Sequence, residues 1–163
     1  MKFKVLLKLQ KLTMKDQLIE KMYEWSKRPY QRFFKNKMAW EINKQELLSY
    51  PEETLGFHLG QFLQKNHFEI QPKLEDHDII HVLTNTGVSV REEIGMQYYL
   101  SGNGKKSLYL YLVILAGTLF YPTHIDYFLK EFRKGKTAYC YHYLDFSKML
   151  LTPISTIQQT FKI

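Results

Sequence analysis

The residues of this chain best suited to chemistry are two histidines and two carboxylates that lie close together in the sequence. His77 is followed by Asp78 and then by His81, and eleven residues separate His81 from Glu93. On a helix the first three share an arc of about 100°, at 100° per residue. The segment Asn85-Thr86-Gly87 predicts a turn, so a second helix can bring Glu93 back against the first.

Two imidazoles with one or two carboxylates are ligands for Zn²⁺ or Fe²⁺, whereas Ca²⁺ takes oxygen ligands. Four ligands would make a closed, structural zinc site, and three would leave a position for water or substrate. Two histidines and one carboxylate also suit non-haem iron. The spacing alone is equally compatible with polar side chains on a helix surface, so metal binding is one of two interpretations at this point.

The elements that must position these residues have mostly helical periodicity, with no repeat or linker between them. A chain of 163 residues with 45% hydrophobic residues can bury a substantial core. Helices are predicted to begin at Asp16, at Ser49 with Glu52 in capping-box spacing, at Leu74, at Ser89 with Glu92, near Lys105 and at Thr123, and a last one covers 138–150. We therefore expect an all-α, single-domain helical bundle over residues 1–163.

Two features of these helices have more than one interpretation. Gly56 and Gly60 form a small-residue strip, which indicates either a close helix crossing or a groove for a ligand chain. The apolar run Leu108–Tyr121 would be about 21 Å long as a helix, too short for a hydrocarbon core of about 30 Å. We interpret it as a buried helix, with partial insertion into one leaflet as the alternative.

The net charge of +7 lies entirely at the N-terminal end, because residues 1–50 hold 12 Lys/Arg and 5 Asp/Glu. Within residues 1–40, a stripe of Lys4, Lys8, Lys11 and Lys15 opposite apolar residues predicts a basic amphipathic helix. An anionic membrane surface, nucleic acid or simple solvation of a packed helix would each explain it. Nucleic acid is disfavoured, because no zinc-finger pattern, aromatic RNA-binding signature or Arg cluster accompanies the charge.

The expected location is cytoplasmic. Cys140 is the single cysteine, so an internal disulfide is excluded and a reducing compartment is natural. Lysines interrupt the apolar residues of Met1–Lys11, which disfavours a secretory signal. The same segment lacks the Arg and Ser of a mitochondrial transit peptide, so we expect a bacterial-type chain.

Two motifs together resemble a known family. His77-Asp78-x-x-His81, eleven residues and Glu93 resemble the signature of the ubiquinone (coenzyme Q) biosynthesis family that contains the fourth Coq protein. Upstream, Tyr50-Pro51-Glu52-x-Thr54-Leu55-Gly56 is similar to that family's Pro-Glu-Gly-Thr-Leu-Gly segment, with Glu53 in place of its first glycine. The resemblance covers roughly residues 45–150.

This resemblance implies an all-helical, often dimeric protein with a metal held by His77, Asp78, His81 and Glu93. It also implies a hydrophobic groove for an isoprenoid or quinone-type lipid, for which Gly56 and Gly60 are the candidates. Peripheral membrane attachment follows from it as well. The implied role is oxidative decarboxylation at ring C1 of a prenylated hydroxybenzoate, or a non-catalytic scaffold that binds lipid and other quinone-biosynthesis enzymes. The resemblance assigns no catalytic residue here.

A second enzyme class fits part of the pattern. A His-Asp-type metal phosphohydrolase would use His58, the pair His77-Asp78 and a distal Asp126. That class has no need of His81 or Glu93, so the two hypotheses differ in the residues that must converge.

Overall fold

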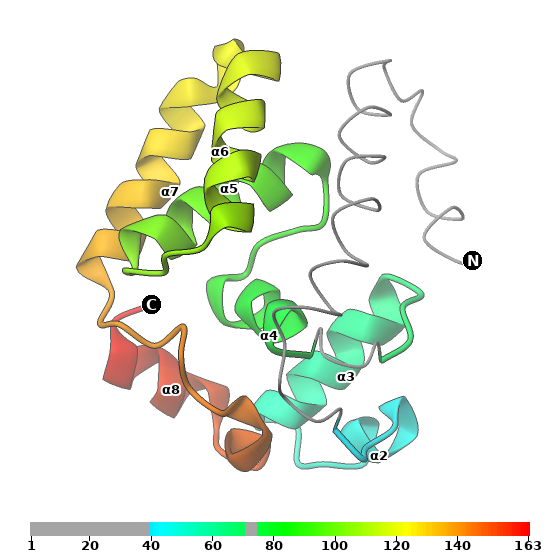
Figure 1. The fold of residues 1–163 in the computed structure, drawn as a ribbon. Coiled ribbons are helices and arrows are strands. Elements are labelled where there is room, and N and C mark those ends of the chain that lie inside the picture. Colours follow the sequence, from blue (N-terminus) through cyan, green and yellow to red (C-terminus); the bar gives the residue numbers. More distant parts are fainter. Residues whose placement is uncertain (1–39, 71–74) are drawn as a thin grey trace.

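The computed structural model describes residues 40–70 and 75–163 (Figure 1). The regular structure in these ranges is helical, without strands. It consists of α2 (Lys44–Leu48), α3 (Leu55–Lys65), α4 (Glu75–Thr84), α5 (Val90–Gly102), α6 (Leu108–Phe120), η2 (Pro122–His124), α7 (Ile125–Thr137), η3 (Phe146–Met149) and α8 (Ile154–Phe161). The prediction of an all-α, single-domain bundle is confirmed. The predicted lysine stripe at residues 4–15 lies outside the described residues.

Helix α5 joins two hydrophobic cores, and Figure 1 shows it in the middle of the fold. Its residues from Ile94 to Leu100 are all buried. One side contributes Met96 and Leu100 to the larger core, which α5 shares with α2, α3, α4 and α8. The other side places Ile94 against Phe128 of α7 in a smaller core to which α6 also contributes. Glu93, directly before this buried run, is therefore carried by the most firmly held helix.

Two glycines allow α5 and α7 to approach until their backbones touch. A methyl group on Gly102 would collide with the carbonyl oxygen of Phe132, and one on Gly135 would collide with that of Tyr99. A side chain at either position would force the helices apart, and overpacking of this kind costs about 1–3 kcal/mol or more. The crossing thus fixes the position of α5 against α7.

The start of α5 follows the predicted capping box. The Ser89 side chain accepts a hydrogen bond from the backbone N–H of Glu92, and the Glu92 carboxylate accepts one from the Ser89 N–H at 3.1 Å. The box predicted at Ser49 and Glu52 is wrong, because Ser49 ends the short helix α2, which the sequence pattern did not predict. Thr54 caps α3 instead, accepting from a backbone N–H of its first turn at 3.3 Å.

The helix predicted over 138–150 is also wrong, since only the short 3-10 helix η3 forms there. The buried side chain of Asn103 explains the difference. Its amide donates to the Tyr139 carbonyl at 3.0 Å, and its oxygen accepts from the Tyr141 N–H at 3.1 Å. The N–H of Tyr139 donates to the Phe161 carbonyl at 2.8 Å, so tertiary bonds replace the helical ones.

The prediction that the apolar run Leu108–Tyr121 forms a buried helix is wrong, because most of α6 is not buried. Of its thirteen residues, only Leu110 and Gly117 are buried. Its inner face packs on α5, where Gly117 lies directly against Ile94. Its outer face carries leucines that are 52% to 71% exposed, at positions 108, 112, 115 and 119.

Candidate metal centre

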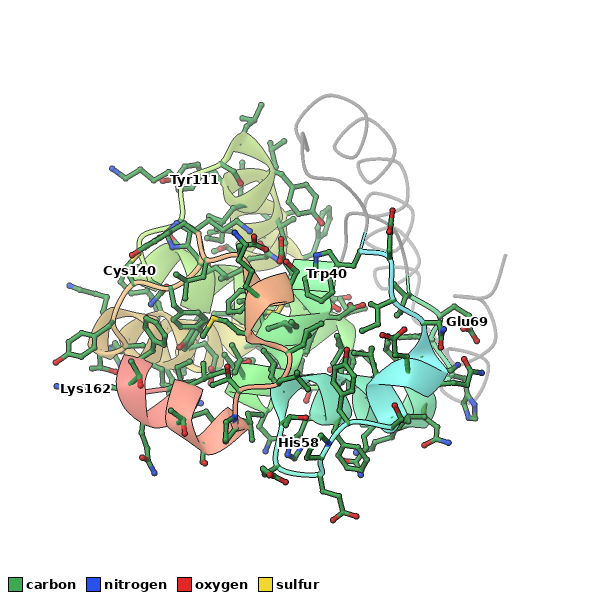
Figure 2. All side chains as sticks on the ribbon, turned by 90° about the horizontal axis from the view of Figure 1, so that it is seen from below. Trp40, His58, Glu69, Tyr111, Cys140 and Lys162 are labelled. Atoms are coloured by element: carbon green, nitrogen blue, oxygen red, sulfur yellow. The ribbon has the colours of Figure 1, made fainter. Side chains whose placement is uncertain are left out.

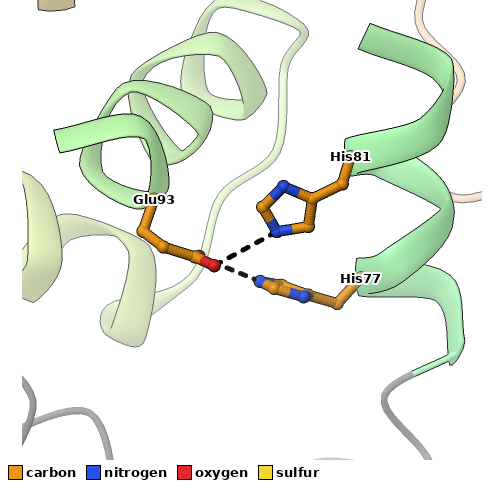
Figure 3. A group of neighbouring side chains, drawn as sticks. All are labelled: His77, His81 and Glu93. Atoms are coloured by element: carbon orange, nitrogen blue, oxygen red, sulfur yellow. Dashed lines mark ion pairs between the residues drawn. The ribbon is translucent and has the colours of Figure 1, made fainter. Parts of the chain in front are cut away.

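Helix α4 presents His77 and His81 one turn apart, and α5 brings Glu93 opposite them (Figure 3). The centroids of the two imidazole rings are 4.8 Å apart. Between the helices Asn85 has a φ of +50°, in the left-handed region that asparagine tolerates. The predicted turn thus ends α4 and redirects the chain so that Glu93 returns to the two histidines.

The Glu93 carboxylate bridges the two rings. Its Oε2 lies 3.3 Å from His77 Nε2, and its Oε1 lies 3.2 Å from His81 Nε2. One ligand atom from each of the three residues lies within 4.8 Å of the others. In a tetrahedral zinc site with bonds of 2.0–2.1 Å, neighbouring ligand atoms are about 3.4 Å apart. The spacing therefore suits a single ion bound by all three side chains.

The second nitrogen of each ring contacts a hydrogen-bond acceptor. His81 Nδ1 donates to the carbonyl oxygen of Thr86 at 3.2 Å, and a carbonyl can only accept, so the hydrogen must lie on Nδ1. His77 Nδ1 lies 3.4 Å from Oδ1 of Asp78, a carboxylate that likewise accepts when ionised. In both rings Nε2 is then the nitrogen that faces Glu93. Metal-binding histidines are usually oriented by such acceptors.

The two Nε2 atoms are the clearest sign that a cation belongs here. Both are buried, and neither has a hydrogen-bond partner among the described residues. A neutral imidazole with its hydrogen on Nδ1 turns a lone pair toward the Glu93 carboxylate, and two electron-rich groups repel each other at this distance. A proton or a metal ion between them removes the repulsion, so the donor set fits a divalent transition metal.

The pKa values of His77 and Glu93 indicate which of these groups carries a charge when no metal is bound. Burial alone lowers the pKa of His77, but the Glu93 and Asp78 carboxylates outweigh burial and raise this pKa to about 9. Burial alone raises the pKa of Glu93, but the imidazoles of His81 and His77 hold it well below its usual range. His77 is thus protonated and Glu93 ionised at neutral pH, and a metal must displace the His77 proton to bind.

The two histidines differ in their surroundings. His81 is 1% exposed, and the Phe62 ring of α3 stacks on it with centroids 5.4 Å apart. The side chains of His77 and Glu93 are 23% and 24% exposed. Among the described residues, His81 is therefore the enclosed member of the site, and the side beside His77 and Glu93 is the more exposed one.

The structure brings together three of the four predicted ligands. Asp78 lies on the Nδ1 side of His77, away from the converging atoms, where it can orient the ring. The sequence pattern did not indicate Phe62 or the Thr86 carbonyl. Phe62 belongs to an ordinary apolar helix pattern, and a backbone carbonyl leaves no residue-type signal.

The glycine strip is filled by the chain itself. A methyl group on Gly56 would press into the Tyr50 ring and the Leu150 carbonyl oxygen, the latter at 3.0 Å. One on Gly60 would lie 3.1 Å from side-chain atoms of Leu47 and Leu48. Both glycines serve close packing in this geometry, which is the first of the two interpretations given for the strip.

The residues that a phosphohydrolase would need do not converge. His58 contacts the Phe57 ring edge-to-face, and Asp126 is exposed in the first turn of α7. In the described part of the chain, the cluster of potential ligands consists of His77, His81 and Glu93. The geometry therefore favours the pattern that uses His81 and Glu93.

Comparison with known proteins adds information on the fold. No family model and no curated protein matches the chain in sequence. A crystal structure from Nostoc punctiforme, named "Putative ubiquinone biosynthesis protein", is similar with a TM-score of 0.64 and 17% sequence identity. The match covers 91% of this chain and 81% of that one, so the two share a fold over most of their lengths.

Proposed function

We propose that this chain is a metal-dependent protein of ubiquinone-type biosynthesis that holds one Zn²⁺ or Fe²⁺ ion through His77, His81 and Glu93. The observation that carries the proposal is the pair of buried Nε2 atoms that converge on one carboxylate, at 3.2 and 3.3 Å. Asp78 supports the site by accepting from His77 Nδ1.

The proposed substrate is a ring compound with an isoprenoid tail, such as a prenylated hydroxybenzoate. The spacing from His77 to Glu93 and the segment Tyr50–Gly56 support this assignment by their resemblance to the ubiquinone-biosynthesis family. The fold shared with the Nostoc punctiforme protein is consistent with it. A homodimer and contacts with other quinone-biosynthesis enzymes belong to the same proposal.

The proposed reaction is oxidative decarboxylation at ring C1. The ring–carboxylate bond breaks and CO₂ leaves, a hydroxyl group from water takes its place, and dioxygen accepts the two electrons and two protons to form hydrogen peroxide. When bound, the metal would supply Lewis-acid or redox chemistry toward a ring hydroxyl or carboxylate. The more exposed side beside His77 admits the head group, Phe62 excludes water behind His81, and Asp78 keeps His77 Nε2 directed at the reacting position.

The proposal is tested with the purified full-length chain. Its metal content is measured by elemental analysis for wild type, His81→Ala and Glu93→Gln, with His67→Asn as the matched control. His67 is an exposed histidine at φ +54°, a backbone conformation that asparagine tolerates. We expect about one transition metal per chain in wild type and in the control, and loss of the metal in the two ligand variants. A metal-free wild type would refute the site.

Catalysis is tested separately from metal binding. The metal-loaded protein is incubated in air with a prenylated hydroxybenzoate, and the product is followed by mass spectrometry. Turnover that disappears in Glu93→Gln and persists in His67→Asn supports the enzyme. A wild type that holds metal and lipid without turnover instead supports the scaffold.

A further inference from the structure

Helix α6 has an apolar outer face that the described part of the chain leaves uncovered. Its thirteen residues, LYLYLVILAGTLF, include no charged side chain. At 100° per residue, the four exposed leucines at positions 108, 112, 115 and 119 fall within about 60° of one another. Tyr111, at the edge of this face, is 48% exposed and lies at the outer rim of the molecule in Figure 2. We call these five residues the leucine face.

This face is unusual for a helix that packs on only one side. A one-sided helix normally has polar residues on its outer side, and a helix that is apolar all round is normally buried or in contact with lipid. The neighbouring helix α7 follows the usual rule, since its exposed residues include Lys130, Arg133, Lys134 and Lys136. Four leucines in one stripe therefore indicate a surface that binds something apolar.

The charges around the leucine face indicate which apolar partner fits. Besides its four exposed basic residues, α7 exposes one acidic residue, Asp126, because Glu131 is buried. Lys106, also exposed, precedes α6. Both helices pack on the same side of α5, where residues of α6 and α7 meet in one hydrophobic cluster. An apolar face on one helix and mainly basic exposed side chains on the neighbouring helix suit an anionic lipid surface.

The length of α6 limits how it can meet a bilayer. Thirteen residues span about 20 Å, less than a hydrocarbon core of about 30 Å. No single helix among the described residues is long and apolar enough to cross a membrane. Helix α6 and the segment Pro122–Thr137 together have the length and composition of a span, but this pair is bent by 104°. An orientation along the surface, with the leucines in one leaflet, fits this length.

We propose that the leucine face of α6 inserts into one leaflet of an anionic bilayer, with the basic side chains of α7 at the lipid head groups. This site is separate from the metal centre, and it does not depend on the N-terminal lysine stripe. Charge favours it over a second copy of the chain, because two copies would each bring the same exposed basic side chains of α7 to the contact.

The test measures co-sedimentation of the full-length chain with vesicles of phosphatidylcholine alone or mixed with phosphatidylglycerol. The double variant Leu112→Glu/Leu115→Glu places two charges in the leucine face. Leu151→Glu is the matched control, because Leu151 is 65% exposed but lies between η3 and α8. We expect the double variant to bind mixed vesicles more than about 10-fold more weakly than wild type, since two leucines no longer enter the leaflet, and the control to bind as wild type does.

A second measurement keeps the proposal testable if the double variant fails to fold. Leu115→Cys in a Cys140→Ser background is labelled with an environment-sensitive fluorophore. Its emission should shift to the blue with mixed vesicles, and the same label at position 151 should not respond. Equal vesicle binding by wild type and a folded double variant would overturn the proposal. So would an unresponsive label at position 115, or a wild-type dimer that ignores vesicles and that the double variant converts to a monomer.

Discussion

The junction of α4 with α5 and the outer side of α6 present opposite anomalies. At the junction, polar nitrogen atoms are buried without hydrogen-bond partners among the described residues. On α6, large apolar side chains are exposed without a cover from those residues. A proton or a metal ion between the imidazoles and Glu93 would satisfy the first arrangement, and an apolar partner would cover the second. The two regions are therefore recognised in the same way, as places where the local environment and the side-chain type disagree.

The largest effect is expected on metal affinity, when a metal-binding side chain at the junction of α4 with α5 is removed. His81→Ala removes one of three converging ligands, and it should weaken metal binding by well over 100-fold, because outer-shell changes alone cost about 10- to 100-fold. Competition with a chelator of known affinity measures the change. Metal affinity in the variant equal to that of wild type would show that His81 is not a ligand.

Two alanine variants, one on each face of α6, compare how much the inner and outer faces contribute to the free energy of unfolding. Leu110→Ala removes a fully buried side chain and should lower the free energy of unfolding by about 2–5 kcal/mol. Leu112→Ala changes a side chain that is 52% exposed and should lower it by less than about 1 kcal/mol. Urea denaturation of both variants without vesicles measures the difference, and equal losses would mean that the outer face is covered.

The role of Asp78 separates an orienting carboxylate from a ligand. If Asp78 only orients His77, Asp78→Ala should weaken metal binding by about 10- to 100-fold and leave the set of directly bound atoms unchanged. The visible spectrum of the Co²⁺-loaded protein reports that set. A spectrum that changes in the variant would instead make Asp78 a fourth ligand, as the sequence pattern predicted.

Proton binding to His77 should make the stability of the metal-free protein depend on pH. The pKa of His77 is raised to about 9 in the folded chain, above 6.5 for the unfolded one. The resulting stabilisation is complete below pH 6.5 and is lost as the pH rises through 9, with a size on the order of 3 kcal/mol. The metal-free protein should thus melt at lower temperature at pH 9 than at pH 6.5, and His77→Gln should lose this difference. If the melting temperatures of wild type and His77→Gln depended on pH in the same way, the raised pKa assigned to His77 would be wrong.

The sequence predicted several parts of the structure that depend on local patterns, although the local pattern at Ser49 and Glu52 did not form the predicted cap. Ser89 and Glu92 form a cap from neighbouring residues, and His77, His81 and Glu93 meet because a helix, a turn and a second helix suffice to join them. These features require only short-range geometry.

The parts that the sequence did not predict depend on distant contacts. Asn103 binds the backbone near Tyr141 and prevents a helix there, although 38 positions separate the two residues. The exposure of α6 depends on which elements cover it, and a run that is apolar all round gives no information about its outer side. Phe62 reaches His81 only through the packing of α3 on α4.

X-ray absorption at the edge of the bound metal reports whether His77, His81 and Glu93 bind one metal ion. Two imidazole nitrogens and a carboxylate oxygen should lie about 2.0–2.2 Å from the metal in the wild-type protein, with one imidazole fewer in His81→Ala that has been reloaded with excess metal. A metal with fewer than two imidazole ligands in the wild-type protein, or one whose surroundings are the same in His81→Ala, would contradict it.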